Sequence, residues 1–235
     1  MKLNSDLAVA AIIVARTDST RLPGKIMEIV AGRPIVDYVI DRALRIPGVD
    51  TVALATTDRD IDDRLVEHAR SRGLAVFRGE TQDVAGRVLA CADSLGADYI
   101  IRVNGDSPFL DPALIGEAMG MLSSGCDLVT NIVGRTFPYG VSVEIIRTEA
   151  LRRAHSAMTD SEREHVTLYF YANADEFKVC GITSNAPDLR TVRLAVDTWE
   201  DLEVFREVVL ELGVDVSTAN YERVAAVYRE LGYTD

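Results

Sequence analysis

Residues 9–25 read VAAIIVARTDSTRLPGK, an apolar run that ends abruptly in a basic loop. The apolar part, residues 9–15, has the length and composition of a buried β-strand. Pro23-Gly24 then bends the chain back. In an open α/β sheet, ligands bind beyond the carboxyl ends of the strands, so this loop lies where such a sheet places its binding site.

The loop carries three cations, Arg16, Arg21 and Lys25, which together favour a polyanion. A solvated basic loop would explain the same charges. However, Ser19 and Gly24 are interleaved with the cations and add hydroxyl and backbone donors that suit phosphate oxygens. The loop matches neither a P-loop nor a dinucleotide-binding fingerprint, because the glycine spacings of both are absent. We therefore expect a phosphate-binding loop of another kind.

Strand-like apolar runs alternate with helical periodicity along the whole chain. We expect strands at 8–15, 51–56, 74–77, 98–103, 126–132, 141–147, 177–183 and 192–197. We expect helices at 34–46, 60–72, 82–95, 111–123, 148–158, 161–173, 198–212 and 217–231. This alternation predicts an α/β fold with a mostly parallel sheet and helices on both faces. The segment 134–172 departs from the alternation, and an inserted hairpin or a dimer arm is expected there.

The bulk composition is that of an ordinary globular protein, with 235 residues, 48% apolar and 26% charged. This length predicts a single domain over 1–235. The net charge of −12 argues against nucleic acid as a partner, since such binding needs a broad basic face. No signal-peptide pattern or membrane-spanning run is found, which predicts a cytoplasmic protein that does not enter the membrane. Cys91, Cys126 and Cys180 have no metal-site or disulfide spacing, so we expect reduced thiols.

Two further strands are followed by an aspartate. Asp106 comes after the buried run 98–103, where Gly105 lets the backbone turn and expose the carboxylate. Such a carboxylate suits Mg²⁺, although Asp also caps turns. Asp111, directly before a proline, is better explained as a helix N-cap. Asp197 ends the run 192–197.

A capping box explains two neighbours of Asp197, namely Thr198 as the cap and Asp201 three residues later. That interpretation leaves Asp197 itself without a role. Two strand-end aspartates, Asp106 and Asp197, facing one phosphate loop would bridge a metal ion to a triphosphate.

The sequence resembles the CMP-sugar synthetases, and most closely the SpsF-like cytidylyltransferases, with acylneuraminate and CMP-Kdo synthetases as more distant relatives. The resemblance covers roughly residues 10 to 205. It rests on A-R-x-x-S-x-R-L-P-G-K at 15–25, G-D-x-P at 105–108 and V-D-T-x-E-D-L-E at 196–203. It implies a three-layer α/β/α, Rossmann-like nucleotide-diphospho-sugar transferase fold of the glycosyltransferase A type, with a mostly parallel mixed sheet. By the same resemblance Asp106 and Asp197 hold the catalytic metal.

The resemblance also implies which residues bind the nucleotide. The loop after the first strand, including Ala15, is expected to hold the triphosphate. Two later stretches, around 55–58 and 77–87, are expected to cradle the cytidine. The expected nucleotide contacts are Ala15, Arg16, Ser19, Arg21, Lys25, Thr57, Asp58, Gly79, Asp83, Arg87 and Asp106. From the residues alone, Asp83 could equally be an N-cap and Arg87 a surface residue.

The acceptor side is expected at Tyr139, Ser142, Glu144 and His165. Many SpsF-like relatives read F-P-R-G-L-D-V-E where this chain has Phe-Pro-Tyr-Gly-Val-Ser-Val-Glu at 137–144. Tyr139 and Ser142 thus replace a positive and a negative charge, which puts the usual sugar acceptor in question. His165 could instead be a core histidine satisfied by Glu162 or a backbone carbonyl.

We therefore predict an enzyme that joins CMP from CTP to a small anionic acceptor and releases pyrophosphate, using Mg²⁺. The attacking oxygen would come from a sugar acid, a phosphate or a phosphonate. Arg16, Lys25, Asp106 and Asp197 are the expected catalytic residues. The alternatives are a uridylyl- or guanylyltransferase on a sugar phosphate and a non-catalytic nucleotide-binding subunit. Family members are commonly dimers through the 134–172 region, so a homodimer is expected, although its aromatic residues could equally be core.

Overall fold

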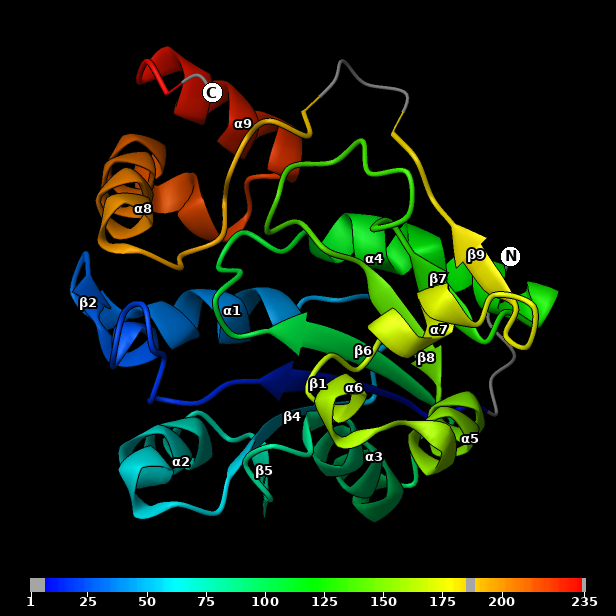
Figure 1. Ribbon diagram of the computed structural model, residues 1–235. Helices are drawn as coiled ribbons and strands as arrows, with labels where there is room; N and C mark the ends of the chain where they lie inside the picture. The colour runs from blue at the N-terminus through cyan, green and yellow to red at the C-terminus, as the bar shows by residue number, and fades with distance from the viewer. Residues whose placement is uncertain (1–6, 185–188, 234–235) are drawn as a thin grey trace.

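A seven-stranded sheet forms the centre of the computed structural model, which describes residues 7–184 and 189–233 (Figure 1). The strand order is β5-β4-β1-β6-β8-β7-β9. Its strands are β1 (Val9–Val14), β4 (Thr51–Thr57), β5 (Ala75–Gly79), β6 (Tyr99–Asn104), β7 (Leu128–Thr130), β8 (Glu144–Arg147) and β9 (Val179–Gly181). All neighbouring pairs are parallel except those made by β8, which runs antiparallel to β6 and β7. The predicted mostly parallel sheet is confirmed.

Helices cover both faces of this sheet, as Figure 1 shows for α1 and α4 on one side and α3 and α5 on the other. The helices are α1 (Ile35–Ala43), α2 (Asp63–Ser71), α3 (Val84–Leu95), α4 (Pro112–Met119), α5 (Thr148–Ala157), α6 (Asp160–Arg163), α7 (Leu168–Ala172), α8 (Trp199–Leu212) and α9 (Tyr221–Glu230). Within the described residues, none of these helices has both the length and the apolar character needed to cross a bilayer.

The alternation of side chains along β1 explains the three layers. Val9, Ala11 and Ile13 pack with α1 and α4, while Ala10 and Ile12 pack with α3 and α5. Successive strand residues point to opposite faces, so a strand that is apolar throughout must be covered on both sides. The sheet is therefore buried along β1, and only its ends are available for binding.

A third core joins the C-terminal helices α8 and α9 to α1. Arg42 on α1 is almost fully buried and ties these parts together by donating to the carbonyls of Leu110 (3.0 Å) and Val216 (2.8 Å). Burial lowers the pKa of the Arg42 guanidinium to about 10, so the group stays charged at neutral pH. A two-residue turn at Ala31 and Gly32, both with positive φ, makes the small hairpin of β2 (Ile29–Val30) and β3 (Arg33–Pro34).

Two predicted elements are wrong. No strand forms at 192–197, because this segment makes only one parallel bridge, between Arg193 and Tyr139, as it crosses to the sheet's carboxyl edge. The predicted helix 161–173 is broken into the short helices α6 and α7. Between them residues 164–167 form turns, and Thr167 donates its hydroxyl to the buried Glu144. The segment 134–172 as a whole supplies β8 and α5 to α7.

The prediction of three reduced thiols is also wrong. Cys126, just before β7, and Cys180, in β9, form a disulfide with their Cα atoms 6.0 Å apart. Their separation of 54 residues hides this proximity in the sequence. It arises because β7 and β9 are parallel neighbours in the sheet. Cys91 is a free, buried thiol as expected, and burial raises its pKa to about 12.

Candidate active site

The basic loop after β1 is fixed to the protein at both of its ends. Leu22 is fully buried in the third core. Gly24 adopts a left-handed conformation (φ 74°) and donates its N–H to the carbonyl of Thr17 at 2.8 Å. These contacts close residues 17–24 into a compact loop before the short 3₁₀ turn Lys25–Met27.

A buried carboxylate that we did not predict holds the start of this loop. Asp62 has no exposed surface and accepts hydrogen bonds from the backbone N–H and the hydroxyl of Thr17, both at 2.7 Å. The hydroxyl of Thr57, at the end of β4, also donates to it. Burial alone would raise the pKa of Asp62, but the hydrogen bonds from Thr17 and Thr57 outweigh it and hold the pKa below its usual value. Asp62 is therefore an ionised anchor between the loop and β4.

The carboxyl end of β6 lies directly against the loop. Gly105 donates to the carbonyl of Val14 at 3.0 Å, and a Cβ on Gly105 would come within 2.7 Å of the side chains of Ala15 and Ile26. Only glycine allows this approach. The next residue, Asp106, is thereby placed beside the loop, as predicted from the sequence.

Asp197 and Asp106 converge on Lys25. The Lys25 Nζ lies 3.2 Å from Asp106 Oδ2 and 2.9 Å from Asp197 Oδ1, and Lys25 is only 9% exposed. Asp197, 2% exposed, also binds Arg21 at 2.9 Å and Arg193 at 2.7 Å. Burial would raise the pKa of Asp197, but the hydrogen bond from Lys25 and the three positive charges lower it. The expected convergence of Asp106 and Asp197 on the basic loop is present, although Asp197 follows an irregular segment rather than a strand.

Asp197 is held by the elements on either side of it. The capping box predicted for Thr198 and Asp201 is confirmed at the start of α8. Val196 donates to the carbonyl of Asp106 at 2.9 Å, which joins the two carboxylate-bearing segments directly. Asp111 caps α4, as expected, by accepting from Ala113 and Leu114.

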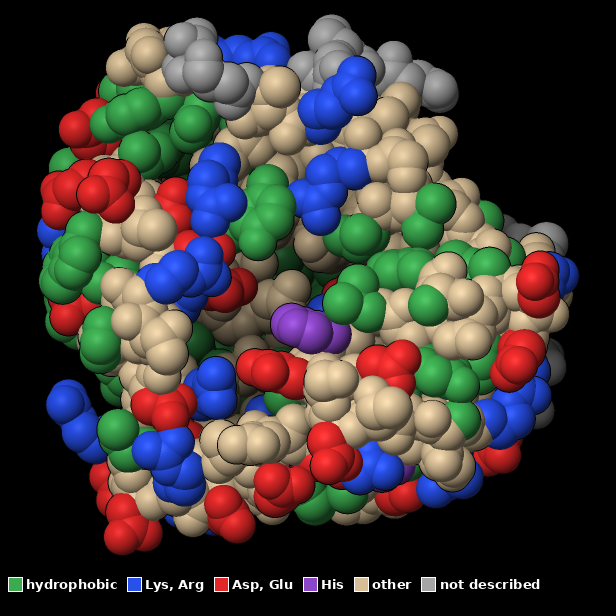
Figure 2. All heavy atoms as spheres, in the orientation of Figure 1, with side chains coloured by type: hydrophobic (Ala, Val, Ile, Leu, Met, Phe, Trp, Pro, Cys, Tyr) green, Lys and Arg blue, Asp and Glu red, His purple; other side chains and the backbone are tan. Residues whose placement is uncertain are grey.

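A cavity of about 390 Å³, here called the lysine cavity, opens over this cluster. It is visible as the central hollow in Figure 2, with a histidine at its edge. Its lining includes Ala15, Arg16, Ser19, Arg21, Lys25, Arg87, Arg102, Asn104, Asp106, His165 and Asp197. Arg87 is buried rather than on the surface, and burial followed by the nearby charge of Arg16 lowers its pKa.

A second cavity of about 160 Å³, here called the tyrosine cavity, adjoins the first. It contains the predicted acceptor residues Tyr139, Ser142 and Glu144. The two cavities share Arg102, Asn104 and Asp106 in their linings. A group bound in one cavity therefore meets a group bound in the other at Asp106.

Glu144 is buried but paired. Arg102 and Thr167 both donate to its carboxylate, and the hydroxyl of Tyr171 lies 3.4 Å away. Burial and the charge of Glu144 raise the pKa of Tyr171 to about 12, so this phenol stays protonated.

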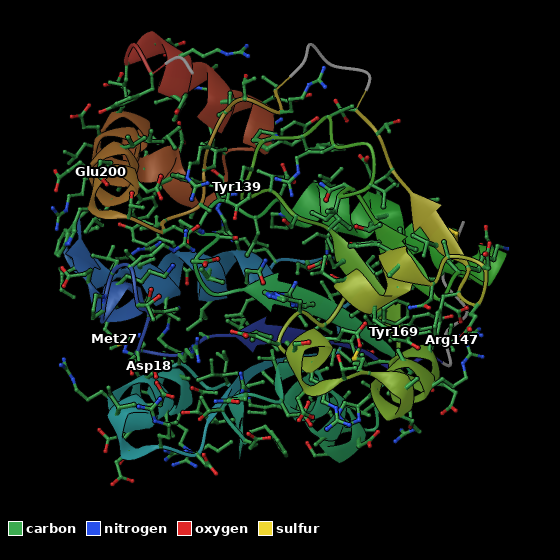
Figure 3. All side chains as sticks on the ribbon, in the orientation of Figure 1. Asp18, Met27, Tyr139, Arg147, Tyr169 and Glu200 are labelled. Carbon is green, nitrogen blue, oxygen red and sulfur yellow. A yellow bond between two sulfur atoms is a disulfide. The ribbon has the colours of Figure 1, made fainter. Side chains whose placement is uncertain are left out.

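A larger cavity, about 520 Å³, lies on the other side of the basic loop. Asp18 and Met27, labelled in Figure 3, line it together with residues of the α2 side. It contains none of Lys25, Asp106 and Asp197, so we place the chemistry in the lysine and tyrosine cavities instead.

Several predicted residues lie outside both cavities. The hydroxyl of buried Thr57 is used by Asp62, and Asp83 caps α3 by accepting from Gly86 at 2.7 Å. Asp58 and Gly79 are likewise absent from the two linings. His165, predicted with the acceptor, lines the lysine cavity rather than the tyrosine cavity. Nucleotide contacts for Thr57, Asp58, Gly79 and Asp83 stay predictions, and the side chains of Thr57 and Asp83 already have structural partners.

Sequence reasoning missed three arginines of the site. Arg102 interrupts the apolar run of β6, which is a readable signal, because a charge in a buried strand needs a partner. Arg193 lies four residues before Asp197 in the expected strand 192–197, and nothing in that pattern indicated that the two side chains pair. Arg135 lies in a loop without a recognisable motif.

The residues at the junction of the two cavities fit a hard divalent cation. Asp106 and Asp197 each place a carboxylate oxygen beside the Lys25 ammonium, at 3.2 and 2.9 Å. In the described part of the chain, no group of three or more Asp, Glu, His or Cys side chains could enclose a metal. Mg²⁺ is commonly held by one or two carboxylates together with phosphate oxygens and water, so this donor set suits an ion that arrives with a polyphosphate.

Comparison with known proteins agrees with this geometry. A family model described as cytidylyltransferase matches residues 10–230. The chain belongs to this family. It is an enzyme of the cytidylyltransferase class, with the Rossmann-like fold that the sequence predicted.

Three proteins illustrate the similarity of this cytidylyltransferase to others. The spore coat polysaccharide biosynthesis protein SpsF of Bacillus subtilis is 31% identical, over 86% of each chain. The structure of a cytidylyltransferase from Leptospira borgpetersenii has a TM-score of 0.90 at 29% identity, covering 96% of this chain and 95% of that one. The structure of CMP:2-keto-3-deoxy-manno-octonic acid synthetase complexed with CTP shares the fold, with a TM-score of 0.64 at 20% identity over 87% and 99% of the two chains.

Proposed function

We propose that this cytidylyltransferase transfers CMP from CTP to a small anionic acceptor, with Mg²⁺ as its cofactor, and releases pyrophosphate. The observation that carries the proposal is the meeting of the lysine and tyrosine cavities at Asp106, beside Lys25 and Asp197. The lysine cavity would hold CTP, and the tyrosine cavity would hold the acceptor.

The lining of the lysine cavity suits a triphosphate. Arg16, Arg21, Lys25 and Arg87 surround it, and Arg87 has hydrogen bonds to backbone carbonyls but no ion pair in the described residues. A related synthetase of the same fold was solved with CTP. Bound triphosphate would compete with the carboxylates for Lys25 and Arg21, which are positioned to hold it and to stabilise the departing pyrophosphate.

The reaction requires no covalent protein nucleophile. An acceptor oxygen attacks the α-phosphorus in line, the new O–P bond forms as the bond to the pyrophosphate oxygen breaks, and a hydroxyl acceptor releases its proton to solvent. Catalysis then depends on positioning and on neutralising charge. Asp106 and Asp197 would hold the Mg²⁺, which supplies charge neutralisation at the phosphates when bound.

Two acceptor classes agree with different observations. A sugar acid agrees with the names of the two relatives that act in polysaccharide biosynthesis or on an octulosonic acid. A phosphate or phosphonate agrees with the small size of the tyrosine cavity, since about 160 Å³ corresponds to roughly five water molecules.

The test is pyrophosphate release by the purified protein with Mg²⁺ and each of CTP, UTP, GTP and ATP. Each nucleotide is offered with sugar acids, sugar phosphates, amino-acid phosphates and phosphonates. We expect release with CTP and one acceptor class. Release with UTP or GTP in preference to CTP, or with no acceptor added, would contradict the proposal.

A further inference from the structure

Arg135, at the edge of the tyrosine cavity, forms no ion pair with any anion in residues 7–184 and 189–233. It is half-buried and lines the cavity, and its guanidinium lies 5.0 Å from the centre of the Tyr139 ring. Arg193 lies 4.4 Å from the same ring. Tyr139 is labelled in Figure 3, and at the same place in Figure 2 a hydrophobic side chain is flanked by two basic ones above the hollow.

The loop that carries Arg135 is rigidly built. Buried Asn131 bridges its ends by donating to the carbonyl of Val141 (2.7 Å) and accepting from the N–H of Val143 (2.9 Å). Tyr139 is fixed through its backbone, which pairs with residues 192 and 194 at 2.9 and 2.7 Å. Gly140 (φ 95°) must be glycine, because a Cβ there would come within 2.5 Å of a backbone nitrogen. The backbone of Tyr139 is therefore fixed, and the Arg135 guanidinium lies over its ring.

The other cations of the two cavities already have partners. Arg16 pairs with Asp18, Arg21 and Lys25 pair with Asp197, and Arg102 pairs with Glu144. Arg87 donates to backbone carbonyls. Among the residues that the structure describes, Arg135 alone of these cations has neither a hydrogen bond nor an ion pair. Arg135 lines the tyrosine cavity, and a guanidinium fork matches a planar or tetrahedral oxyanion.

We propose that Arg135, held on the ring of Tyr139, binds an oxyanion of the acceptor other than the oxygen that attacks CTP. The acceptor is then a small molecule with two functional ends: a nucleophilic oxygen at Asp106, and a carboxylate, phosphonate or phosphate at Arg135. This inference rests on the proposed function and makes its acceptor class specific. It also explains how a cation is kept at this cavity although position 139 carries a tyrosine.

The test uses acceptors that differ only in the second anion. One pair is 3-deoxy-manno-octulosonate and its carboxamide, and the other is phosphonoacetate and phosphonoacetamide. Pyrophosphate release from CTP is measured with wild-type protein, Arg135→Ala and Arg135→Lys. The matched control is Arg153→Ala, because Arg153 also lies over a ring, 5.3 Å from the centre of Phe177, but lines neither cavity.

We expect the wild type to prefer the acid of at least one pair. Arg135→Ala should lower kcat/KM for that acid about ten- to a hundredfold, as expected for a lost hydrogen bond to a charged group. Arg135→Ala should leave kcat/KM for the amide and the KM for CTP within about twofold of the wild-type values. Arg135→Lys should recover part of the loss, and Arg153→Ala should behave as wild type. The pair that responds identifies the acceptor as a sugar acid or a phosphonate.

Calorimetric titration of the same four compounds, with CMP present, separates the two proposals. If Arg135→Ala still turns over the acid in preference to the amide, the role of Arg135 is overturned and the proposed function stands. The same holds if the variant impairs kcat/KM for CTP and for the acceptor to the same extent. If the acid binds to the wild type but not to Arg135→Ala, the anion site is supported. If no pyrophosphate is released in the same experiment, the proposed function is overturned. Absence of both binding and turnover overturns both.

Discussion

Lys25 is a buried ammonium held by two carboxylates from distant parts of the chain. The carboxylates hold Lys25 in place, and we expect the phosphate oxygens of a bound triphosphate to compete with them for its ammonium. The same applies to Arg21, although it is far more exposed. Screening by solvent makes the exposed pair weaker than the buried one.

Replacing Lys25 with Ala removes charge-assisted hydrogen bonds worth about 1.5–3 kcal/mol each. We expect kcat/KM for CTP to fall ten- to a hundredfold or more, with the circular dichroism spectrum unchanged. Lys178, the other lysine of the described chain, lies outside both cavities and provides the control, Lys178→Ala. Kinetics of Lys25→Ala close to wild type would remove this loop from the mechanism.

Asp106→Asn and Asp197→Asn should each nearly abolish turnover. Because both carboxylates are proposed to hold one ion, we expect the double variant to be little worse than either single one. EDTA should stop the reaction and added Mg²⁺ restore it. Full activity in EDTA, or additive and mild effects of the two substitutions, would show that the aspartates do not share a metal. Calorimetric titration with Mg²⁺ and CTP measures the loss of metal and nucleotide binding in these variants without relying on turnover.

At the level of elements, the order of strands and helices could be predicted because it follows from apolar periodicity. Asp106 and Asp197 could be found because each follows an apolar run. What the sequence did not show depends on contacts between distant segments. Thr167, at the break between α6 and α7, meets Glu144 from a distant strand, and Cys126 meets Cys180 because β7 and β9 are adjacent. Asp62 looked like an ordinary helix-start residue, since only the fold brings Thr17 to it.

Asp62→Asn should loosen the loop from β4 and destabilise the fold. Loss of hydrogen bonds to a buried carboxylate should cost about 1–3 kcal/mol of unfolding free energy and raise the KM for CTP. Asp60→Asn, at an exposed position two residues earlier, is the control. In Asp62→Asn the KM for CTP should rise and the urea midpoint should fall. An unchanged KM would show that Asp62 has a purely structural role.

The lowered pKa of Asp62 also fixes the sign of its pH dependence. Its stabilisation is fully present above the unfolded pKa of about 3.9 and is lost as pH falls through the lower, folded value. The difference in unfolding free energy between wild type and Asp62→Asn should therefore shrink below about pH 4.

For the whole molecule, the disulfide between Cys126 and Cys180 ties the short edge strand β9 to β7. In the chain-entropy description, closing a loop of 54 residues stabilises the folded state by about 4 kcal/mol, because it restricts the unfolded chain. Reductant should therefore lower the Tm by about 8–16 °C, at about 2–4 °C per kcal/mol. The double variant Cys126→Ser/Cys180→Ser should show the lower Tm with or without reductant. The Tm of Cys91→Ser should still fall when reductant is added. A Tm that ignores reductant in the wild type would contradict the bridge.

A homodimer stays a prediction for the assembled molecule. Two of the aromatic residues that suggested it, Phe137 and Phe170, are core residues, and Phe170 packs against Phe177. Leu168 and Tyr139 remain exposed in the same region. We expect light scattering to give twice the mass of the chain at micromolar concentration, and Leu168→Asp to weaken the association. A single-chain mass at working concentration would reject the dimer.

The contact between Lys25 and Asp197 spans 172 residues, and this distance has a consequence for how the protein is made. The pairing of β1 with β4 and β6 needs only the first half of the chain, whereas Asp197 enters just before α8. Loop closure over such a span is slow relative to local pairing. We therefore expect a nascent chain to pair its central strands before Asp197 can reach Lys25.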